Sequence, residues 1–123
     1  MRPSPPSLQQ PEFAKLLPIK KIPMLQHYIL IKYKEGASDE HIEEFCRKML
    51  ALRDVISEIE HLEIGRDILH DARSWDLILI MRFASVEALR SYQQHPEHLS
   101  LMAFNQRSVE SVASVDFPSD ATV

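Results

Sequence analysis

Hydrophobic and polar side chains alternate with a period of two from Met24 to Lys34. One side of this pattern carries Leu25, His27, Ile29, Ile31 and Tyr33. Because successive side chains of a strand point to opposite faces, the alternation predicts a first β-strand. Gly36 then marks a turn that ends it.

The period changes to that of a helix after this turn. Ser38 is a residue type that caps helices, and Asp39 and Glu40 suit the positive end of a helix dipole. Apolar residues then recur every three or four positions, which predicts a helix of about five turns with one apolar face. These residues are Ile42, Phe45, Met49, Leu52, Ile56 and Ile59.

Two strands joined by a hairpin loop are predicted next. The strands cover residues 61–69 and 75–83, and the polar stretch 70–74 lies between them. The second of these strands contains the uninterrupted apolar run Leu77, Ile78, Leu79, Ile80 and Met81. An apolar run of this kind implies that both faces of the strand are covered.

The remaining pattern predicts two helical segments and a closing strand. The first helix covers residues 85–94 and ends there because a proline disfavours helix in the residue before it. Pro96 suits the first position of a second helix, over about 96–110, and a strand follows at 112–117. The order β-α-β-β-α-β predicts an α+β, ferredoxin-like protomer.

The N-terminal region differs in composition from the rest of the chain. Six of the eight prolines fall within residues 1–23, and this density disfavours both helix and central strand. We therefore expect a proline-rich extension at 1–23, either flexible or a docking arm. A folded domain at 24–118 and a C-terminal tail at 119–123 complete the predicted organisation.

Composition narrows the function classes. The net charge of -4 argues against a dedicated nucleic-acid binder. The single cysteine suits a reducing compartment, and no apolar run approaches the roughly 20 residues of a membrane helix. We expect a cytoplasmic protein without nucleic-acid or membrane partners. A chain of this length buries only about two-thirds of its unfolded surface, so stabilisation by dimerisation is plausible.

Five short stretches occur in order between residues 24 and 118. They are residues 27–34, 64–67, 83–89, 92–98 (Tyr-Gln-Gln-His-Pro-Glu-His) and 115–117. Together they resemble the stress-responsive α/β barrel (Dabb) family of the dimeric α/β-barrel superfamily. The resemblance implies a homodimer in which the sheets of two ferredoxin-like protomers form an α/β barrel.

The resemblance also implies a candidate catalytic pair. Tyr92 and His98 match the tyrosine and histidine with which the olivetolic acid cyclase of this family, a plant polyketide cyclase, drives an intramolecular aldol condensation. This reaction needs a base and a donor to the developing oxyanion. His98 follows Pro96 in the first helical turn, where the helix dipole disfavours an imidazolium ion. The helix break at Pro96 permits the two side chains to converge.

A ligand pocket beside this pair is implied in the same way. Its expected residues are His27, Ile29, Ile31, Cys46, Met49, Leu79 and Val109. His27 matches a histidine of the cyclase pocket. Cys46, Met49 and Val109 stand where the cyclase has larger aromatic residues, so we expect a different ligand.

Three functions remain open from the sequence. The first is a non-catalytic homodimer that binds a small hydrophobic or polyketide-like ligand, or has a protective role. The second is a cofactor-free, cyclase-like enzyme that uses Tyr92 and His98. The third, suggested by the fold alone, is a cofactor-free monooxygenase. In a purely structural alternative, His95 caps the second helix and His98 closes hydrogen bonds between helix and sheet.

We expect neither a cofactor nor a metal ion. His95 and His98 are three residues apart, as are His41 and Glu44, but zinc needs three or four ligands. Cys46 lies beside the apolar stripe of its helix and is expected to pack there.

Overall fold

The computed structural model describes residues 21–122. Its elements are β1 (Lys21–Tyr33), α2 (Asp39–Ala51), the short 3₁₀ helix η2 (Leu52–Asp54), β2 (His61–Arg66), β3 (Leu77–Phe83), α3 (Val86–Gln94), α4 (Pro96–Gln106) and β4 (Val109–Thr122). The strands form one antiparallel sheet in the order β2-β3-β1-β4. The predicted ferredoxin-like α+β fold is therefore confirmed. No helix within 21–122 is both long and apolar enough to cross a bilayer.

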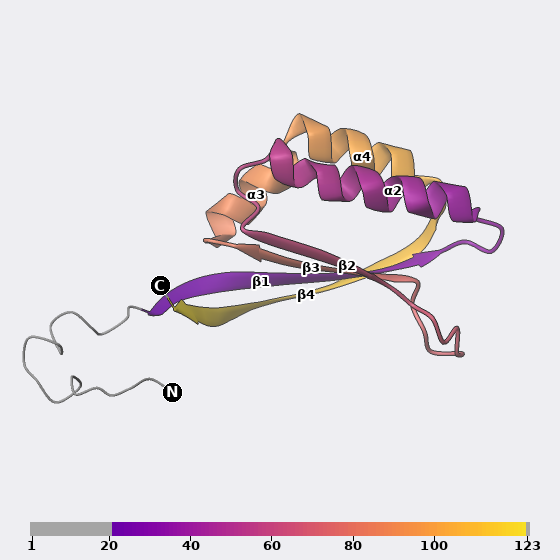
Figure 1. Ribbon diagram of the computed structural model, residues 1–123, viewed down its shortest axis with the longest axis horizontal. Helices are drawn as coiled ribbons and strands as arrows, with labels where there is room; N and C mark the ends of the chain where they lie inside the picture. Colours follow the sequence, from indigo (N-terminus) through magenta and orange to yellow (C-terminus); the bar gives the residue numbers. More distant parts are fainter. Residues whose placement is uncertain (1–20, 123) are drawn as a thin grey trace, which may run out of the picture.

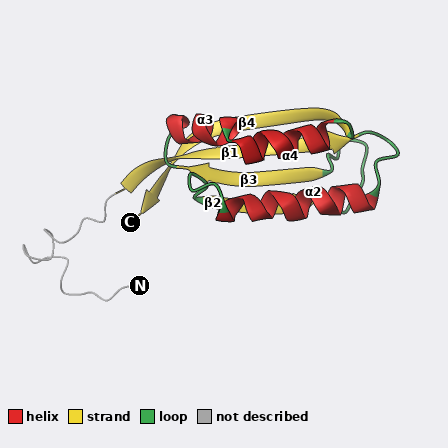
Figure 2. Ribbon diagram, turned by 90° about the horizontal axis from the view of Figure 1, so that it is seen from above, coloured by secondary structure: helices red, strands yellow, loops and turns green. Residues whose placement is uncertain are grey.

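The helices cover one face of the sheet (Figure 1). Viewed from above, α2 lies over the half of the sheet that contains β2, whereas α4 lies over β1 (Figure 2). Nothing within the described part of the chain covers the opposite face (Figure 1). The two halves of the helical layer thus stand over different strands, and this division decides which residues can meet beneath each helix.

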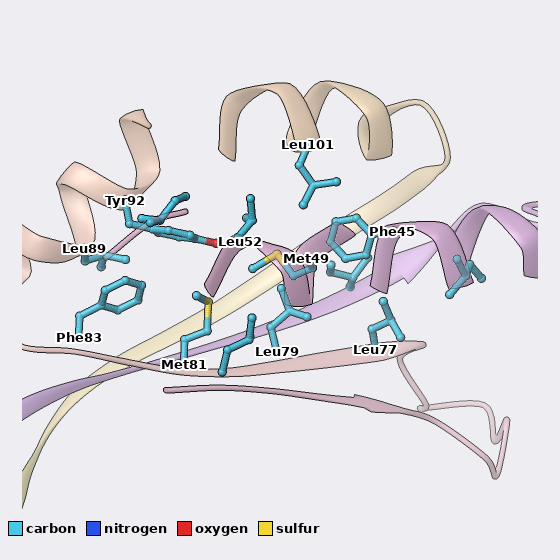
Figure 3. Packing of buried hydrophobic residues seen from close by; sticks show 14 of the residues in the cluster. Phe45, Met49, Leu52, Leu77, Leu79, Met81, Phe83, Leu89, Tyr92 and Leu101 are labelled. Atoms are coloured by element: carbon cyan, nitrogen blue, oxygen red, sulfur yellow. The ribbon is translucent and has the colours of Figure 1, made fainter. Parts of the chain in front are cut away.

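The hydrophobic core fills the space between the helices and the sheet (Figure 3). Phe45 and Met49 of α2 meet the alternate side chains of β3 and are fully buried. In β3 the buried side chains are Leu77, Leu79, Met81 and Phe83. Burying apolar side chains of this size contributes roughly 1.5–3 kcal/mol each. The core therefore secures α2 to the centre of the sheet.

The opposite side of the sheet is also rich in apolar residues. We call it the open sheet face, and its large apolar members are Tyr28, Leu30, Ile78, Ile80, Val115 and Phe117. The rings of Tyr28 and Phe117 meet edge to face with centroids 5.2 Å apart. Val115 remains 63% exposed, and Ile78 and Ile80 are only partly buried. Within one protomer the predicted burial of both faces of β3 is thus incomplete.

The first helix is shorter than its apolar pattern predicts. α2 ends at Ala51, and η2 continues only to Asp54. Ile56 is nevertheless 1% exposed, and its backbone N–H donates to the Leu52 carbonyl at 2.8 Å. Ile56 and Ile59 therefore join the core from a loop rather than from a helix, and the prediction of about five turns is wrong.

The first and last strands in the sequence extend beyond the predicted domain limits. β1 begins at Lys21 and β4 ends at Thr122, so the boundaries at 24 and 118 fall inside strands. Pro23 fits in β1 because it pairs with β4, whereas β3 joins β1 only from Leu25 onward. On that unpaired side proline costs no ladder hydrogen bond. Of the arm expected at residues 1–23, residues 21–23 begin β1, and residues 1–20 lie outside the described residues.

Helix caps position the C-terminal half of the helical layer. Ser85 accepts a hydrogen bond from the Ala88 N–H at 3.0 Å and begins α3. His95 has an extended backbone, and its Nδ1 accepts from the Glu97 N–H at 3.1 Å. Pro96 then opens α4, as predicted. α3 and α4 are therefore separated by a single residue that redirects the chain.

Candidate functional site

A cavity of about 590 Å³ lies between α4 and the half of the sheet formed by β1 and β4. Seven of the nine predicted site residues line it: Tyr92, His98, His27, Ile29, Ile31, Leu79 and Val109. Most of its wall is apolar, and a few polar groups point into it. The structure thus brings together residues from β1, β3, β4, α3 and α4 at one site.

Strand register explains the floor of this cavity. His27, Ile29 and Ile31 are alternate residues of β1 and therefore share one face of the sheet. Their partners in β4 lie beside them on the same face: Asp116, Ser114 and Val112, respectively. Leu79 stands opposite Ile29 on the other side. The helix-facing side of three adjacent strands is thus one continuous surface.

Cys46 and Met49, predicted for the same pocket, lie outside it. Met49 is fully buried in the core beneath α2. Cys46 is half-buried, and burial raises the pKa of its thiol, while nearby Arg66 of β2 opposes that shift. Both residues belong to α2, which lies over the β2 half of the sheet (Figure 2). Neither of them lines the cavity beneath α4.

Tyr92 and His98 come from different helices and are in contact. Their ring centroids are 4.4 Å apart, with the planes inclined at 51°. Tyr92 is only 2% exposed, and its ring also tilts against Phe83 of β3 at 5.0 Å. The change of direction at His95 turns the start of α4 back toward α3. The two rings thereby occupy the same end of the cavity.

A backbone carbonyl fixes the proton of His98. Its Nδ1 lies 3.0 Å from the carbonyl oxygen of Gln93. Because a carbonyl can only accept, Nδ1 carries the hydrogen and Nε2 keeps a free lone pair. Burial lowers the pKa of His98, opposed by the Gln93 carbonyl and reinforced by His27 and His95. His98 is therefore a neutral imidazole with an available acceptor.

Tyr92 supplies the complementary group. Burial raises the pKa of its hydroxyl, so the phenol stays protonated and can donate. Among residues 21–122, neither this hydroxyl nor His98 Nε2 has a hydrogen-bond partner. In the described chain, Arg82 Nε is the only side-chain polar atom that is both buried from solvent and without a hydrogen-bond partner, so neither of these two atoms is cut off from solvent. Both atoms are thus available to a molecule in the cavity.

His27 adds a second polar group to the floor. It is 5% exposed, and its Nδ1 is hydrogen-bonded to Asp116 Oδ1. Its ring meets Phe83 edge to face at 5.9 Å. Sequence reasoning missed the site role of Asp116, although the alternation of Val112, Ser114 and Asp116 in β4 is a signal that could have placed it.

Asn105 is a further cavity residue that the sequence analysis missed. It is 3% exposed, and its side chain contacts Tyr33 and His41. It follows His98 by seven residues on α4, a spacing that returns to the same helical face. This spacing was the available signal.

The other histidine candidates have structural partners. His95 caps α4, and His41 contacts Asn105 at 3.0 Å. In the part of the chain that the structure describes, no three His, Cys, Asp or Glu side chains come together as possible metal ligands.

Comparison with known proteins identifies the family. A family model described as Stress responsive A/B Barrel Domain matches residues 25–119. The stress-response A/B barrel domain-containing protein HS1 of Arabidopsis thaliana is 28% identical over 97 residues, which cover 76% of this chain and 87% of that protein. Olivetolic acid cyclase of Cannabis sativa is 26% identical over 77 residues, which cover 61% of this chain and 76% of the cyclase. The resemblance carried by five short stretches is thus confirmed.

A solved structure agrees in fold. A protein of unknown function from Bacteroides fragilis, described as dimeric with a ferredoxin-like fold, aligns with a TM-score of 0.71 and 26% identity. The alignment covers 78% of this chain and 96% of that one.

Proposed function

The chain belongs to the stress responsive A/B barrel domain family, and from this premise we propose that it forms a homodimer and binds a small, mainly apolar molecule beneath α4. One observation carries the ligand-binding function: the cavity of about 590 Å³ combines apolar walls with the inward-facing Tyr92 and His98. Sites for small molecules typically pair a mainly apolar wall with a few convergent polar groups.

The polar pair indicates which chemical group the ligand carries. The Tyr92 hydroxyl donates and His98 Nε2 accepts, and both are within one end of the cavity. A hydroxyl group can satisfy both, as can an enolisable carbonyl. Phenols and polyketide-like molecules contain such groups on an apolar skeleton. The presence of olivetolic acid cyclase among the relatives supports this class.

Filling the cavity tests this function. Val109 is half-buried at the start of β4 and lines the cavity. Val109→Trp places an indole in the space where the ligand would lie. We expect para-hexylphenol, a phenol with an apolar chain, to bind the wild-type chain and to bind Val109→Trp about tenfold more weakly or worse. Isothermal titration calorimetry measures both affinities.

The same substitution at another valine is the control. Val86 is 52% exposed at the start of α3 and does not line this cavity. Val86→Trp should bind para-hexylphenol as the wild type does. Wild-type protein that binds no para-hexylphenol contradicts the proposed function. If Val109→Trp binds para-hexylphenol as tightly as the wild type does, the ligand binds outside this cavity.

The open sheet face supports the proposed homodimer. Its apolar residues lie on adjacent strands and are only partly buried in the protomer. Contiguous apolar surface of this kind marks interaction sites in soluble proteins. A second copy of the same chain offers a matching surface across a two-fold axis. The description of the Bacteroides fragilis relative as dimeric supports the same assembly.

The geometry of Tyr92 and His98 favours one second candidate, a cyclase-like enzyme. His98 Nε2 can remove a proton from the carbon next to a ligand carbonyl. The carbanion then attacks a second carbonyl of the same molecule, and Tyr92 donates to the developing alkoxide. The contact of the two rings at 4.4 Å, with Nε2 free, suits these roles.

A product assay distinguishes the enzyme from a binding protein. A linear poly-β-keto thioester should cyclise faster with wild-type protein than in buffer, and Tyr92→Phe or His98→Gln should slow it by about a hundredfold. Bound thioester that cyclises no faster than in buffer rules out this enzyme and leaves the binding function.

A further inference from the structure

Asn105 lies at a second polar position in the cavity, away from the Tyr92–His98 pair. His98, Met102 and Asn105 line the cavity from α4 and are spaced four and then three residues apart. This spacing follows one face of a helix. At a rise of 1.5 Å per residue, seven residues separate His98 and Asn105 by about 10 Å along the axis.

Two hydrogen bonds orient the Asn105 amide. Tyr33 Oη lies 2.7 Å from Asn105 Oδ1, and His41 Nε2 lies 3.0 Å from the same oxygen. An amide oxygen only accepts, so the hydroxyl and the imidazole N–H both donate to it. In the reversed orientation, the Tyr33 hydroxyl proton would have no acceptor among residues 21–122. A buried donor without a partner is costly, so the reversed orientation is disfavoured.

Both partners are held firmly by their surroundings. Tyr33 is 6% exposed, and burial raises the pKa of its hydroxyl to about 12, so it remains a donor. The His41 ring stacks on the Phe104 ring with centroids 4.6 Å apart. Lys48 Nζ lies over the same Phe104 ring, 4.1 Å from its centroid. The Asn105 oxygen is thus fully engaged on the side away from the ligand space.

The amide nitrogen of Asn105 is not used in these hydrogen bonds. Asn105 Nδ2 has no hydrogen-bond partner among residues 21–122, yet it is not one of the described buried atoms cut off from solvent. Because Asn105 is 97% buried and lines the cavity, the space open to its N–H groups is the cavity itself. A buried asparagine whose donors face an open space is suited to recognise an acceptor.

We propose that Asn105 is a specificity-determining residue that donates a hydrogen bond to a neutral carbonyl oxygen of the ligand, about 10 Å from the group held by Tyr92 and His98. Asn105 lies in the last turn of α4. The partial negative charge at a helix C-terminus disfavours a carboxylate there, so the acceptor is a ketone, ester or amide oxygen. This inference rests on the proposed ligand-binding function and specifies the ligand as a molecule with two polar ends.

A matched pair of probes tests this role. The first is para-hexylphenol, and the second is the same phenol whose six-carbon chain ends in a methyl ketone. We expect Asn105→Asp to weaken the binding of both probes unequally. The loss of affinity for the ketone should exceed the loss for para-hexylphenol by about threefold to tenfold. Aspartate keeps the oxygen that Tyr33 and His41 contact and removes the N–H donors.

A second measurement uses only the wild-type protein, so its result does not depend on whether the variant folds. The chain contains a single asparagine, so its side-chain amide can be assigned in an NMR spectrum. The ketone should shift the Asn105 amide signals, and para-hexylphenol should shift them much less. Equal affinity for the two probes, or a ketone that leaves the Asn105 signals in place, overturns the role of Asn105 while the cavity still binds phenols. Absence of binding by both probes overturns the proposed function as well.

Discussion

At the scale of single residues, burial keeps the Tyr92–His98 pair neutral. Burial raises the pKa of the Tyr92 hydroxyl and lowers that of the His98 imidazole. One group therefore stays a donor, while the other stays an acceptor, near neutral pH. The Gln93 carbonyl fixes which nitrogen of His98 accepts. The pair can therefore recognise a ligand through two uncharged and opposite hydrogen-bonding groups.

The lowered pKa of His98 predicts a pH dependence of stability. In the unfolded chain His98 regains its usual pKa of 6.5 and binds a proton more readily than in the folded state. The stability that depends on neutral His98 is complete above that value and is lost as the pH falls through the lower folded-state pKa. We expect His98→Gln to lose less stability than wild type on acidification through this window, as measured by urea unfolding.

A second histidine variant provides the control. His70 lies exposed in the loop between β2 and β3, with φ of 54°. Asparagine tolerates this backbone conformation, so His70→Asn should fold normally. Because this variant keeps His98, it should lose stability on acidification as steeply as the wild type. If His98→Gln and the wild type lose stability equally, His98 is not held neutral by the fold.

At the scale of elements, helix caps hold Tyr92 in place. Ser85 accepts from the Ala88 N–H at 3.0 Å and begins the helix that carries Tyr92. Ser85→Ala removes this acceptor and should lower the free energy of unfolding by about 1 kcal/mol. Chemical denaturation measures the change.

Another serine of the same helix separates capping from helix propensity. Ser91 lies exposed within α3. Ser91→Ala should leave the stability within about 0.5 kcal/mol of wild type, because alanine favours a helix interior. Similar losses in both variants would mean that the Ser85 side chain does not cap α3.

Most elements could be predicted because their signals are local. Ser38, Ser85 and Pro96 mark helix starts in the sequence, and the structure uses all three in that way. The end of α2 had no such signal: no glycine or proline follows it, and Ile56 and Ile59 continue the helical spacing although a loop carries them. A pattern of buried residues shows which side chains enter the core and does not show the backbone that delivers them.

The site was partly predictable for a similar reason. The motif at 92–98 and the alternation in β1 pointed to residues that do line the cavity. The position of α2 over the β2 half of the sheet depends on tertiary packing, so the exclusion of Cys46 and Met49 could not be foreseen. The free amide of Asn105 depends on contacts with Tyr33 and His41, which lie 72 and 64 residues away in sequence.

At the scale of the whole molecule, the two faces of the sheet have separate tasks. The helix-facing side forms the cavity, and in the proposed homodimer the open sheet face binds a second copy. Ile80 points to the open sheet face from the middle of β3 and is only partly buried. Ile80→Glu should therefore yield a folded monomer, since a pair of buried glutamates at the interface would be costly. Sedimentation velocity at tens of micromolar protein measures the assembly.

A helix-side variant is the control for this change. Leu99 is 55% exposed on α4 and does not line the cavity. Leu99→Glu should leave the dimer intact. A wild-type chain that sediments as a monomer, or an Ile80→Glu variant that stays dimeric, would contradict pairing through the open sheet face.

The cavity beneath α4 is the central element of this function, and a structure with a bound probe tests it most directly. Crystals of the full chain grown with the methyl-ketone phenol should show the probe between α4 and β1, with its phenol oxygen between the Tyr92 hydroxyl and His98 Nε2. A probe bound on the open sheet face, or a cavity without the probe at saturating concentration, would contradict the proposed function.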